Sequence, residues 1–445
     1  MMALRMGRIG GLVGGLLLLV AAAVLLYGKL EGEVPELWLS PDPVAIGKLT
    51  KFKLSAEDRR SGLKELKVSL EQGARVVKVL EESFPSGTHQ VERVLEISAD
   101  ALQFQEGTAL FRAEVKDRSW RGGNPRVLTA NVRVDTRPPS LSILSPFHYL
   151  NQGGSGVVAF RASEPLASGG VRVGERWFRA YPMGSDNGWF ALFAVSHDAS
   201  PQVPIHLEAE DLAGNRTTAQ FKYQIRPKKF RQDSIRLSEE FLQRILPYFL
   251  ERDQALKGQP QEMFLQINRE LRKQNELSIQ EICSKTHPEP LWSGSFLRMA
   301  NAKPMAGFAD RRTYIWKDKA IDEQVHLGVD LASLVTSPVE AANKGRVVFA
   351  GELGIYGNTV VLDHGCGLFS MYSHLSQISA AMGQVVGKGE RLGLSGSTGL
   401  AGGDHLHFSI LVGGVYVNPI EWWDPHWLKD NIEDKLALLL KPTGS

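Results

Sequence analysis

Two histidines separated by one residue form the strongest chemical signal in this 445-residue chain. His405 and His407 lie in an apolar run that is typical of a β-strand, where side chains alternate between two faces, so both imidazoles are expected on one side. A pair of imidazoles on one face suits metal binding or proton transfer near neutral pH. Because such a pair also occurs on ordinary strands, its meaning depends on partners elsewhere in the chain.

Residues upstream of this pair supply such partners. His326 and Asp330 form an H-x-G-x-D pattern, and His374 lies between the two motifs. Zinc in hydrolases typically takes three protein ligands of the His, Asp or Glu type and keeps one position open for water. His326, Asp330 and one histidine of the pair would make such a set, which leaves two histidines for acid–base chemistry.

These motifs resemble the lysostaphin-type (LytM-like) zinc metallopeptidases of bacterial cell walls. The resemblance covers about residues 292–423 and includes the glycine-rich stretches and the Val-Asn-Pro motif at residues 383–390, 393–399 and 417–419. The resemblance implies that His326, Asp330 and His407 bind one zinc ion. It also implies that His374 and His405 are the catalytic histidines.

One stretch departs from the family pattern. Residues 308–311 read Phe-Ala-Asp-Arg, where family members often have Phe-Gly-x-Arg. This departure could alter the wall of the substrate groove. Tyr314, which follows it, is a candidate groove residue, and His364 is expected to be structural.

The resemblance implies hydrolysis of a peptide bond by a water molecule that zinc activates. His405 resembles the general base of the family, and His374 resembles its partner, which hydrogen-bonds the water or the oxyanion. The sequence does not fix which histidine does which.

Three functions are compatible with these residues. The leading prediction is a membrane-anchored zinc metalloendopeptidase that hydrolyses the peptide cross-links of peptidoglycan. The alternative is a noncatalytic LytM-like regulator that activates a cell-wall amidase. Such regulators typically lack some of the zinc ligands or catalytic histidines, whereas all five positions are filled here. A third function is a peptidase that acts on a protein, for example on a glycine-rich loop.

Composition sets broad bounds on the chain. A length of 445 residues is enough for about three domains. Hydrophobic residues make up 43% of the chain and charged residues 22%, which is ordinary for a folded protein. The formal net charge is only +2, and no stripe of Lys and Arg is present, so nucleic acid is not an expected partner.

The chain has two cysteines, Cys283 and Cys366, and lacks the C-x-x-C spacing of a cysteine zinc site. In an oxidising compartment they could form a disulfide between the helical region and the catalytic domain. Two separate buried thiols are the equally weighted alternative.

The N-terminal residues 1–28 are predicted to be a cytoplasmic tip and a membrane anchor. Residues 9–27 form an uncharged apolar run long enough to span a bilayer, and Arg5 and Arg8 precede it. The positive-inside rule then places the N-terminus in the cytoplasm and the rest outside. We expect a single-pass protein of the inner membrane that faces the periplasm. A cleaved signal peptide is the competing interpretation.

The overall expectation is a multidomain, mainly β protein. Short alternating runs predict two immunoglobulin-like β-sandwich modules, at residues 33–136 and 137–227. Residues 113–117 with 122–124 parallel residues 208–215, which resemble the A-x-D-x-A-G-N turn of bacterial immunoglobulin-like modules. The Asp and Asn are expected to shape a turn with their own side chains. The modules are expected to be spacers or docking surfaces for an envelope protein.

A helical linker region is predicted at residues 228–285. Apolar residues at helical spacing predict a helix over residues 237–256, with Ser238 as N-cap and Pro247 kinking or dividing it. A second helix is predicted over residues 261–283. The two could simply pack on each other or on a neighbouring domain, or they could be a regulatory element that partly covers the catalytic cleft.

The rest of the chain reads as strands and glycine turns. Residues 286–430 are predicted to form a small antiparallel β peptidase domain with a groove that the histidines line. Residues 431–445 are predicted to be a C-terminal tail.

Overall fold

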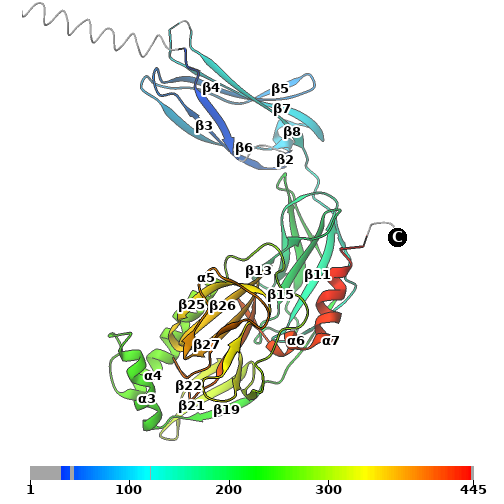
Figure 1. Cartoon of the computed structure of the whole chain (residues 1–445). Coiled ribbons are helices and arrows are strands. Elements are labelled where there is room, and N and C mark those ends of the chain that lie inside the picture. The colour runs from blue at the N-terminus through cyan, green and yellow to red at the C-terminus, as the bar shows by residue number, and fades with distance from the viewer. Residues whose placement is uncertain (1–31, 41–44, 121, 442–445) are drawn as a thin grey trace, which may run out of the picture. The chain divides into compact units, whose positions relative to one another are not determined.

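The computed structural model describes residues 32–40, 45–120 and 122–441, and Figure 1 shows the chain. The predicted anchor at residues 9–27 lies outside the described residues. Among the helices that the structure does describe, none combines the length and apolarity that a membrane span requires. The described residues form two compact units, which confirms a mainly β, multidomain chain. Each unit is described by itself.

The first unit contains the described residues up to Pro139 together with Glu210–Arg216. Two sheets share one hydrophobic core in it. One sheet has the order β1-β3-β6, with β1 (Glu36–Ser40), β3 (Thr50–Glu57) and β6 (Gln90–Ile97). The other has the order β2-β8-β7-β4-β5, with β2 (Ala45–Ile46), β8 (Pro125–Val134), β7 (Gly107–Asp117), β4 (Leu63–Gln72) and β5 (Arg75–Ser83). A short helix, α2 (Ala99–Leu102), follows β6.

Alternation builds the core of this unit. In β7, the side chains of Ala109, Phe111, Ala113 and Val115 are buried and those between them are more exposed, as period 2 requires. The predicted immunoglobulin-like character of this region stays a prediction.

The repeated Asp and Asn residues shape two turns in the same way. Oδ1 of Asp117 accepts hydrogen bonds from the N–H groups of Ser119 and Asn124. Oδ1 of Asp211 likewise accepts hydrogen bonds from the N–H groups of Ala213 and Asn215. In both turns the Asn side chain donates back to the other oxygen of the Asp. The prediction that these side chains form the turns is therefore confirmed.

The second unit contains residues 140–209 and the described residues from Thr217 onward. Its first part is β-rich, with sheets of order β14-β15-β11-β9 and β13-β12-β16-β17 and a β10-β18 pair. The strands are β9 (Leu141–Ile143), β10 (His148–Asn151), β11 (Ser155–Ala162), β12 (Leu166–Val173), β13 (Arg176–Arg179), β14 (Tyr181–Pro182), β15 (Gly188–Ala194), β16 (Ile205–Asp211), β17 (Arg216–Ala219) and β18 (Tyr223–Arg226).

The predicted domain bounds at residues 137–227, 228–285 and 286–430 stay predictions. This β-rich region lies in the same compact unit as the predicted peptidase region. The physical reason is a shared buried contact. The indole N–H of Trp422 donates to Oγ of Ser155, and Trp422 is fully buried. Beside it, the carboxylate of Glu421 accepts hydrogen bonds from Nδ2 of Asn151 at 2.7 Å and from the N–H of Ser155 at 3.1 Å.

Glu421 gives this contact a predicted pH dependence. Burial raises the pKa of its carboxyl from 4.5 to about 7, although the hydrogen bonds from Asn151 and Ser155 oppose the rise. The folded state therefore binds the proton more tightly than the unfolded state does. The free energy of unfolding should fall as pH rises from about 4.5 to about 7, by about 3 kcal/mol, and then stay level.

Thermal unfolding between pH 4.5 and 8 checks this prediction. Glu421→Gln cannot ionise, so the melting temperature of the variant relative to wild type should rise across that window. Glu281→Gln, at an exposed position, is the matched control and should follow wild type. Parallel curves for wild type and Glu421→Gln would contradict the prediction.

The helical region begins with β19 (Gln232–Arg236), which pairs in parallel with β21. Helix α3 (Glu239–Leu250) follows, and Oγ of its N-cap Ser238 accepts a hydrogen bond from the N–H of Phe241, as predicted. Pro247 lies inside α3 near its C-terminal end and does not divide it. Helix α4 (Pro260–Gln266) starts one residue before the second predicted helix. It continues through a π-helical turn, η1 (Ile267–Leu271), into α5 (Arg272–Ile282).

The predicted peptidase region is built on one antiparallel sheet of order β20-β23-β31-β27-β26-β25-β29, with β32 paired to β31. Its strands are β20 (Lys303–Ala306), β23 (Val329–Ala332), β25 (Gly345–Glu352), β26 (Asn358–Gly365), β27 (Leu368–Leu375), β29 (Val385–Val386), β31 (Leu406–Val412) and β32 (Val415–Val417). Smaller sheets contain β21 (Asp310–Trp316), β22 (Lys319–His326), β24 (Pro338–Glu340), β28 (Gln377–Ile378) and β30 (Arg391–Leu394). A 3-10 turn, η2 (Gly354–Tyr356), joins β25 to β26. The predicted antiparallel β architecture is therefore confirmed.

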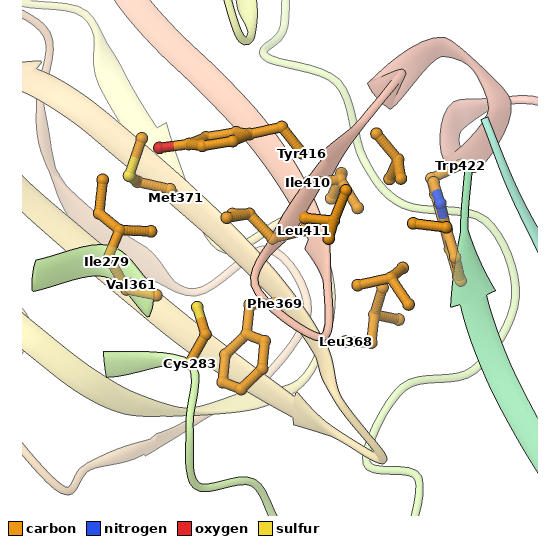
Figure 2. Close-up of a cluster of buried hydrophobic side chains, with 14 of the residues drawn as sticks. Ile279, Cys283, Val361, Leu368, Phe369, Met371, Ile410, Leu411, Tyr416 and Trp422 are labelled. Atoms are coloured by element: carbon orange, nitrogen blue, oxygen red, sulfur yellow. The ribbon is translucent and has the colours of Figure 1, made fainter. Parts of the chain in front are cut away.

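Helix α5 is fixed to this sheet by a buried cluster. Figure 2 shows Ile279 of the helix and its C-cap residue Cys283 beside Val361 and Phe369 of the sheet, and all of them belong to one hydrophobic core. Cys283 and Cys366 are both buried free thiols. This structure therefore has the two separate buried thiols and not the disulfide. Burial raises the pKa of each thiol to about 12, which keeps both protonated near neutral pH.

The predicted tail is partly helical. Helices α6 (Pro419–Trp423) and α7 (Pro425–Leu428) continue through a π-helical turn, η3 (Lys429–Glu433), into α8 (Asp434–Ala437). Ile432 and Leu439 are buried, which explains why the chain stays ordered beyond residue 430. The side chain of Arg161 also donates a hydrogen bond to the carbonyl of Lys441.

Candidate metal centre and active site

Strand pairing brings the two sequence motifs together. In the antiparallel register of β23 and β31, Asp330 lies directly opposite His407, and Ser373 of β27 lies on the other side of His407. Because directly opposed residues in a sheet are close neighbours, the register explains how motifs far apart in sequence share one site. His326 ends β22, just before the turn into β23.

Three ligand atoms converge on one point. Nε2 of His326, Oδ1 of Asp330 and Nδ1 of His407 lie 2.9 Å from one another in every pair. These three residues form a group that could hold a metal ion. Two imidazoles and one carboxylate are a donor set that suits zinc and leaves a coordination position open.

The hydrogen bonds of His326 leave its inward nitrogen free to bind a metal. Its Nδ1–H donates to the carbonyl of Gly307 at 2.8 Å. This bond fixes the tautomer, so that Nε2 carries a lone pair. The ring is buried and cannot easily turn away.

A second set of hydrogen bonds leaves one ring nitrogen of His407 free to bind a metal. The hydroxyl of Ser409 donates to the carbonyl of Leu327 at 2.8 Å, so its oxygen is free to accept from Nε2–H of His407 at 3.1 Å. Nδ1 of His407 is then the nitrogen with the lone pair. Outer partners of this kind orient a ligand and raise its basicity. The residues present therefore fit a zinc ion.

Gly328 makes this arrangement sterically feasible. A Cβ at this position would lie 2.5 Å from Nε2 of His407 and 2.7 Å from Oγ of Ser409, which is closer than real Cβ atoms approach other heavy atoms. We predict that Gly328→Ala displaces the His407 ring and weakens zinc affinity by about 10–100-fold, as loss of outer-shell support typically does.

Competition with a chromogenic zinc chelator measures this effect on the purified full chain. Gly387→Ala is the matched control, because a Cβ there would meet only one atom, at an ordinary 3.8 Å. A Gly328→Ala variant with wild-type zinc affinity would show that the ring has room to move.

The charge of Asp330 is held in place by its surroundings. Burial alone would raise the pKa of its carboxyl, but the neighbouring histidines, His326 first, outweigh burial and hold that pKa well below its usual range. The guanidinium of Arg312 donates from Nη2 to Oδ2 of Asp330 at 3.1 Å. Oδ1 thus faces the two imidazoles while Oδ2 is tied to Arg312.

His374 lies beside this group in a strained backbone conformation. Its φ of 64° is in the left-handed region, which is uncommon for a residue with a side chain and is often found at functional sites. Its Nδ1–H donates to the carbonyl of Thr398 at 2.8 Å, so Nε2 carries the lone pair. Burial first, and then the charges of His405 and His407, lower the pKa of His374 well below its usual value.

His405 completes the cluster. Its ring centroid is 4.8 Å from that of His374, and its Nε2 is 3.5 Å from Oδ1 of Asp330. Its Nδ1–H donates to the carbonyl of Gly403. Burial lowers the pKa of His405, but the hydrogen bond and charge of Asp330 outweigh burial and raise it overall. Both histidines therefore hold Nδ1–H on a backbone carbonyl and keep Nε2 as a proton acceptor.

One pocket contains all five residues that the sequence singles out. Its volume is about 460 Å³, and His326, Asp330, His374, His405 and His407 all line it. The remaining lining residues come from the helical region, from β20 to β23 and from three turns: Ile235, Arg272, Met305, Arg312, Tyr314, Ala332, Ile355, Tyr356, Leu400, Gly402, Gly403 and Asp404.

The residues that depart from the family pattern lie at the edge of this site. Ala309 occupies the place of the usual glycine and has a φ of 60°, the conformation that glycine adopts most easily. Its N–H donates to the carbonyl of His326, so the strained turn supports the first ligand. Arg312 lines the pocket, whereas Arg311, the arginine of the motif, is exposed. Tyr314 lies in the pocket wall, as predicted.

His364 lies outside the pocket, as expected for a structural residue. It is fully buried, and its two nitrogens contact the carbonyl of Lys344 and Oγ of Ser370. Sequence reasoning missed three residues of the site: Arg312, Ser409 and Arg272. Ser409 could have been found from the alternation of β31, because it continues the face that carries His405 and His407.

Comparison with known proteins agrees with this geometry. Residues 324–419 match Peptidase family M23. A stretch of 97 residues is 42% identical to the DD-carboxypeptidase/endopeptidase Mpg of Neisseria meningitidis. A stretch of 96 residues is 41% identical to the peptidoglycan DD-endopeptidase ShyA of Vibrio cholerae. Each match covers 22% of this chain and 22% of the relative, so the chain spans about a fifth of the length of these curated relatives.

The chain is also similar to a solved structure. The catalytic domain of lysostaphin from Staphylococcus simulans is 29% identical, with a TM-score of 0.26. That likeness covers 29% of this chain and 98% of the lysostaphin domain.

Proposed function

We propose that this chain, whose residues 324–419 form a peptidase M23 domain, is a zinc metalloendopeptidase that hydrolyses the peptide cross-links of peptidoglycan. The observation that carries the proposal is the convergence of two imidazoles and one carboxylate, 2.9 Å apart, beside two further histidines in one pocket. The substrate class is taken from the names of the relatives in Neisseria meningitidis and Vibrio cholerae.

His326, Asp330 and His407 would hold the zinc ion. When bound, zinc supplies a Lewis acid that polarises the scissile carbonyl and lowers the pKa of a water molecule. Asp330 brings a single negative charge against the two positive charges of zinc, so the centre stays electrophilic. Arg312 keeps that carboxylate in position through Oδ2.

The two remaining histidines would manage the proton. Nε2 of His405 can take a proton from water and return it to the leaving amine, and the raised pKa of this residue favours that role. His374 is kept neutral by burial, so its Nε2 can accept a hydrogen bond from the same water and orient it. The backbone carbonyls of Gly403 and Thr398 hold both rings in the required orientation.

Product analysis tests this function against the amidase-regulator alternative. Purified peptidoglycan is digested with the full chain, and the soluble products are separated after muramidase treatment. An endopeptidase should convert cross-linked dimers to monomers without an added amidase. If the chain alone leaves the dimers intact and instead makes an added amidase release peptides from glycan, the regulator function would be correct. Because all five positions are filled, we expect the first outcome.

We also propose that residues 9–27 anchor the chain in the inner membrane, with the rest facing the periplasm. The support is the uncharged apolar run preceded by Arg5 and Arg8. Protease added to spheroplasts should then digest a C-terminally tagged chain without membrane lysis, and only detergent should extract the intact chain. Release by osmotic shock would indicate a cleaved signal peptide instead. The predicted envelope partner of the β modules stays a prediction.

A further inference from the structure

Two arginines line the pocket that contains the histidines, and they come from different parts of the chain. Arg312 belongs to β21, and Arg272 is the first residue of α5 in the helical region. Arg312 is paired with Asp330, whereas among the described residues no carboxylate pairs with Arg272. The pocket therefore contains a guanidinium that forms no ion pair with a described acidic side chain.

A buried network holds Arg272 in place. Its Nε donates to the carbonyl of Asn268 at 3.1 Å, and its Nη2 donates to Oδ1 of the same residue at 2.6 Å. Nδ2 of Asn268 donates to Oδ2 of Asp322 at 2.7 Å, and Asn268 is fully buried. Nη1 of Arg272 has no hydrogen-bond partner among the described residues. One edge of the guanidinium is thus anchored while the other stays available.

The helix geometry directs this arginine toward the site. The π-helical turn η1 lies immediately before Arg272 and contains Asn268. Such turns shift the face on which the following side chains lie and are frequent at functional sites. One turn further along α5, Oδ1 of Asn275 accepts a hydrogen bond from the N–H of Ile355, which fixes the helix against η2.

Arg272 lines the same pocket as His326, His374, His405 and His407. Burial raises the pKa of the Tyr356 phenol, and the charge of Arg272 opposes that rise. The ring centroid of Tyr356 is 5.6 Å from that of His407. Arg272, Tyr356 and His407 all line this pocket.

We propose that Arg272 determines specificity by binding a free carboxylate of the substrate next to the bond that is cut. A guanidinium recognises a carboxylate through a strong, charge-assisted hydrogen bond. In a cross-link whose amine stands on a carbon that also bears a carboxyl group, this carboxylate lies beside the scissile amide. The inference rests on the proposed function and makes the helical region part of the substrate site.

The test compares two substrates that differ in one group. Purified cross-linked muropeptide dimers carry the carboxyl group beside the scissile amide either free or amidated, and both are cleaved with the zinc-loaded full chain. Wild type should prefer the free carboxylate by about 10–100-fold in kcat/KM, as expected for one charge-assisted contact. Arg272→Gln should remove this preference by raising KM for the carboxylate substrate. It should lower kcat/KM for the carboxylate substrate far more than kcat/KM for the amidated substrate, and the zinc content should match wild type.

Two further variants sharpen the test. Arg272→Lys keeps the positive charge but loses the planar guanidinium with its paired N–H donors. This variant should therefore keep only part of the preference for the free carboxylate. Lys273→Gln removes a positive charge from the neighbouring exposed position, outside the pocket, and should behave as wild type.

Each other outcome has a distinct meaning. Equal cleavage of both substrates by wild type would overturn the inference and leave the endopeptidase function intact. An equal loss on both substrates in Arg272→Gln, together with a lowered melting temperature, would assign Arg272 a structural role and also overturn it. Failure of wild type to cleave either dimer would overturn the proposed function and the inference with it.

Discussion

Asp330→Asn should lose zinc and activity together. The substitution keeps the shape of the side chain but removes the only negative charge of the ligand set. A neutral amide oxygen is a much poorer ligand for zinc, and it no longer balances Arg312 or attracts His405. We expect zinc content near zero after dialysis and a loss of about 10³-fold or more in kcat/KM, because the Lewis acid is gone.

Elemental analysis of the purified full chain, together with dimer cleavage, measures both effects. His326→Ala and His407→Ala should behave in the same way. His426→Ala replaces an exposed histidine away from the pocket and is the matched control. Full zinc occupancy in Asp330→Asn would mean that the metal is held elsewhere.

His405→Ala should lose activity but keep zinc, because this histidine is assigned to proton transfer. Zinc content should match wild type, while kcat falls by about 10²–10⁴-fold, the usual contribution of a general acid–base group. His374→Ala should likewise keep zinc, since Nε2 of His374 is not one of the three converging atoms.

The pH profile of kcat distinguishes the two histidines. The limb that reports a base should disappear in His405→Ala, whereas His374→Ala should keep its shape at a lower rate, because burial keeps this ring neutral. A His405→Ala variant without zinc would contradict the assignment of the ligands.

The core of the candidate site could be predicted because short-range rules determine it. Alternation along β31 places His405 and His407 toward one pocket, and the H-x-G-x-D motif keeps His326 within one turn of Asp330. The resemblance then identified which histidine joins the ligand group. These inferences need only local geometry and ordered motifs.

The missing parts depend on tertiary packing. Arg272 is far from the motifs in sequence, and it reaches the pocket only because α5 docks on the sheet through Ile279 and Cys283 and because a π-helical turn precedes it. No periodicity rule predicts such a turn. The packing of the β-rich region that begins at residue 140 against the predicted peptidase region likewise depends on tertiary structure. It involves the buried contacts of Glu421 and Trp422.

Packing explains two local features that sequence preference alone does not. Pro247 removes one helical hydrogen bond, but burial of Ile245, Leu246 and Phe249 keeps α3 intact through its last turn. The segment after residue 430 contains an apolar run at residues 436–440, and burial of Ile432 and Leu439 fixes this segment to the rest of the unit. In both places packing determines the local structure.

Digestion of purified cross-linked dimers by the full chain, before and after zinc removal, tests most directly whether this pocket is a zinc endopeptidase site. We predict that the chain converts dimers to monomers, that a chelator abolishes cleavage, and that one equivalent of zinc per chain restores it. Asp330→Asn should stay inactive after the same addition of zinc. Cleavage that persists in the chelated protein, or in Asp330→Asn, would contradict the assignment of this site.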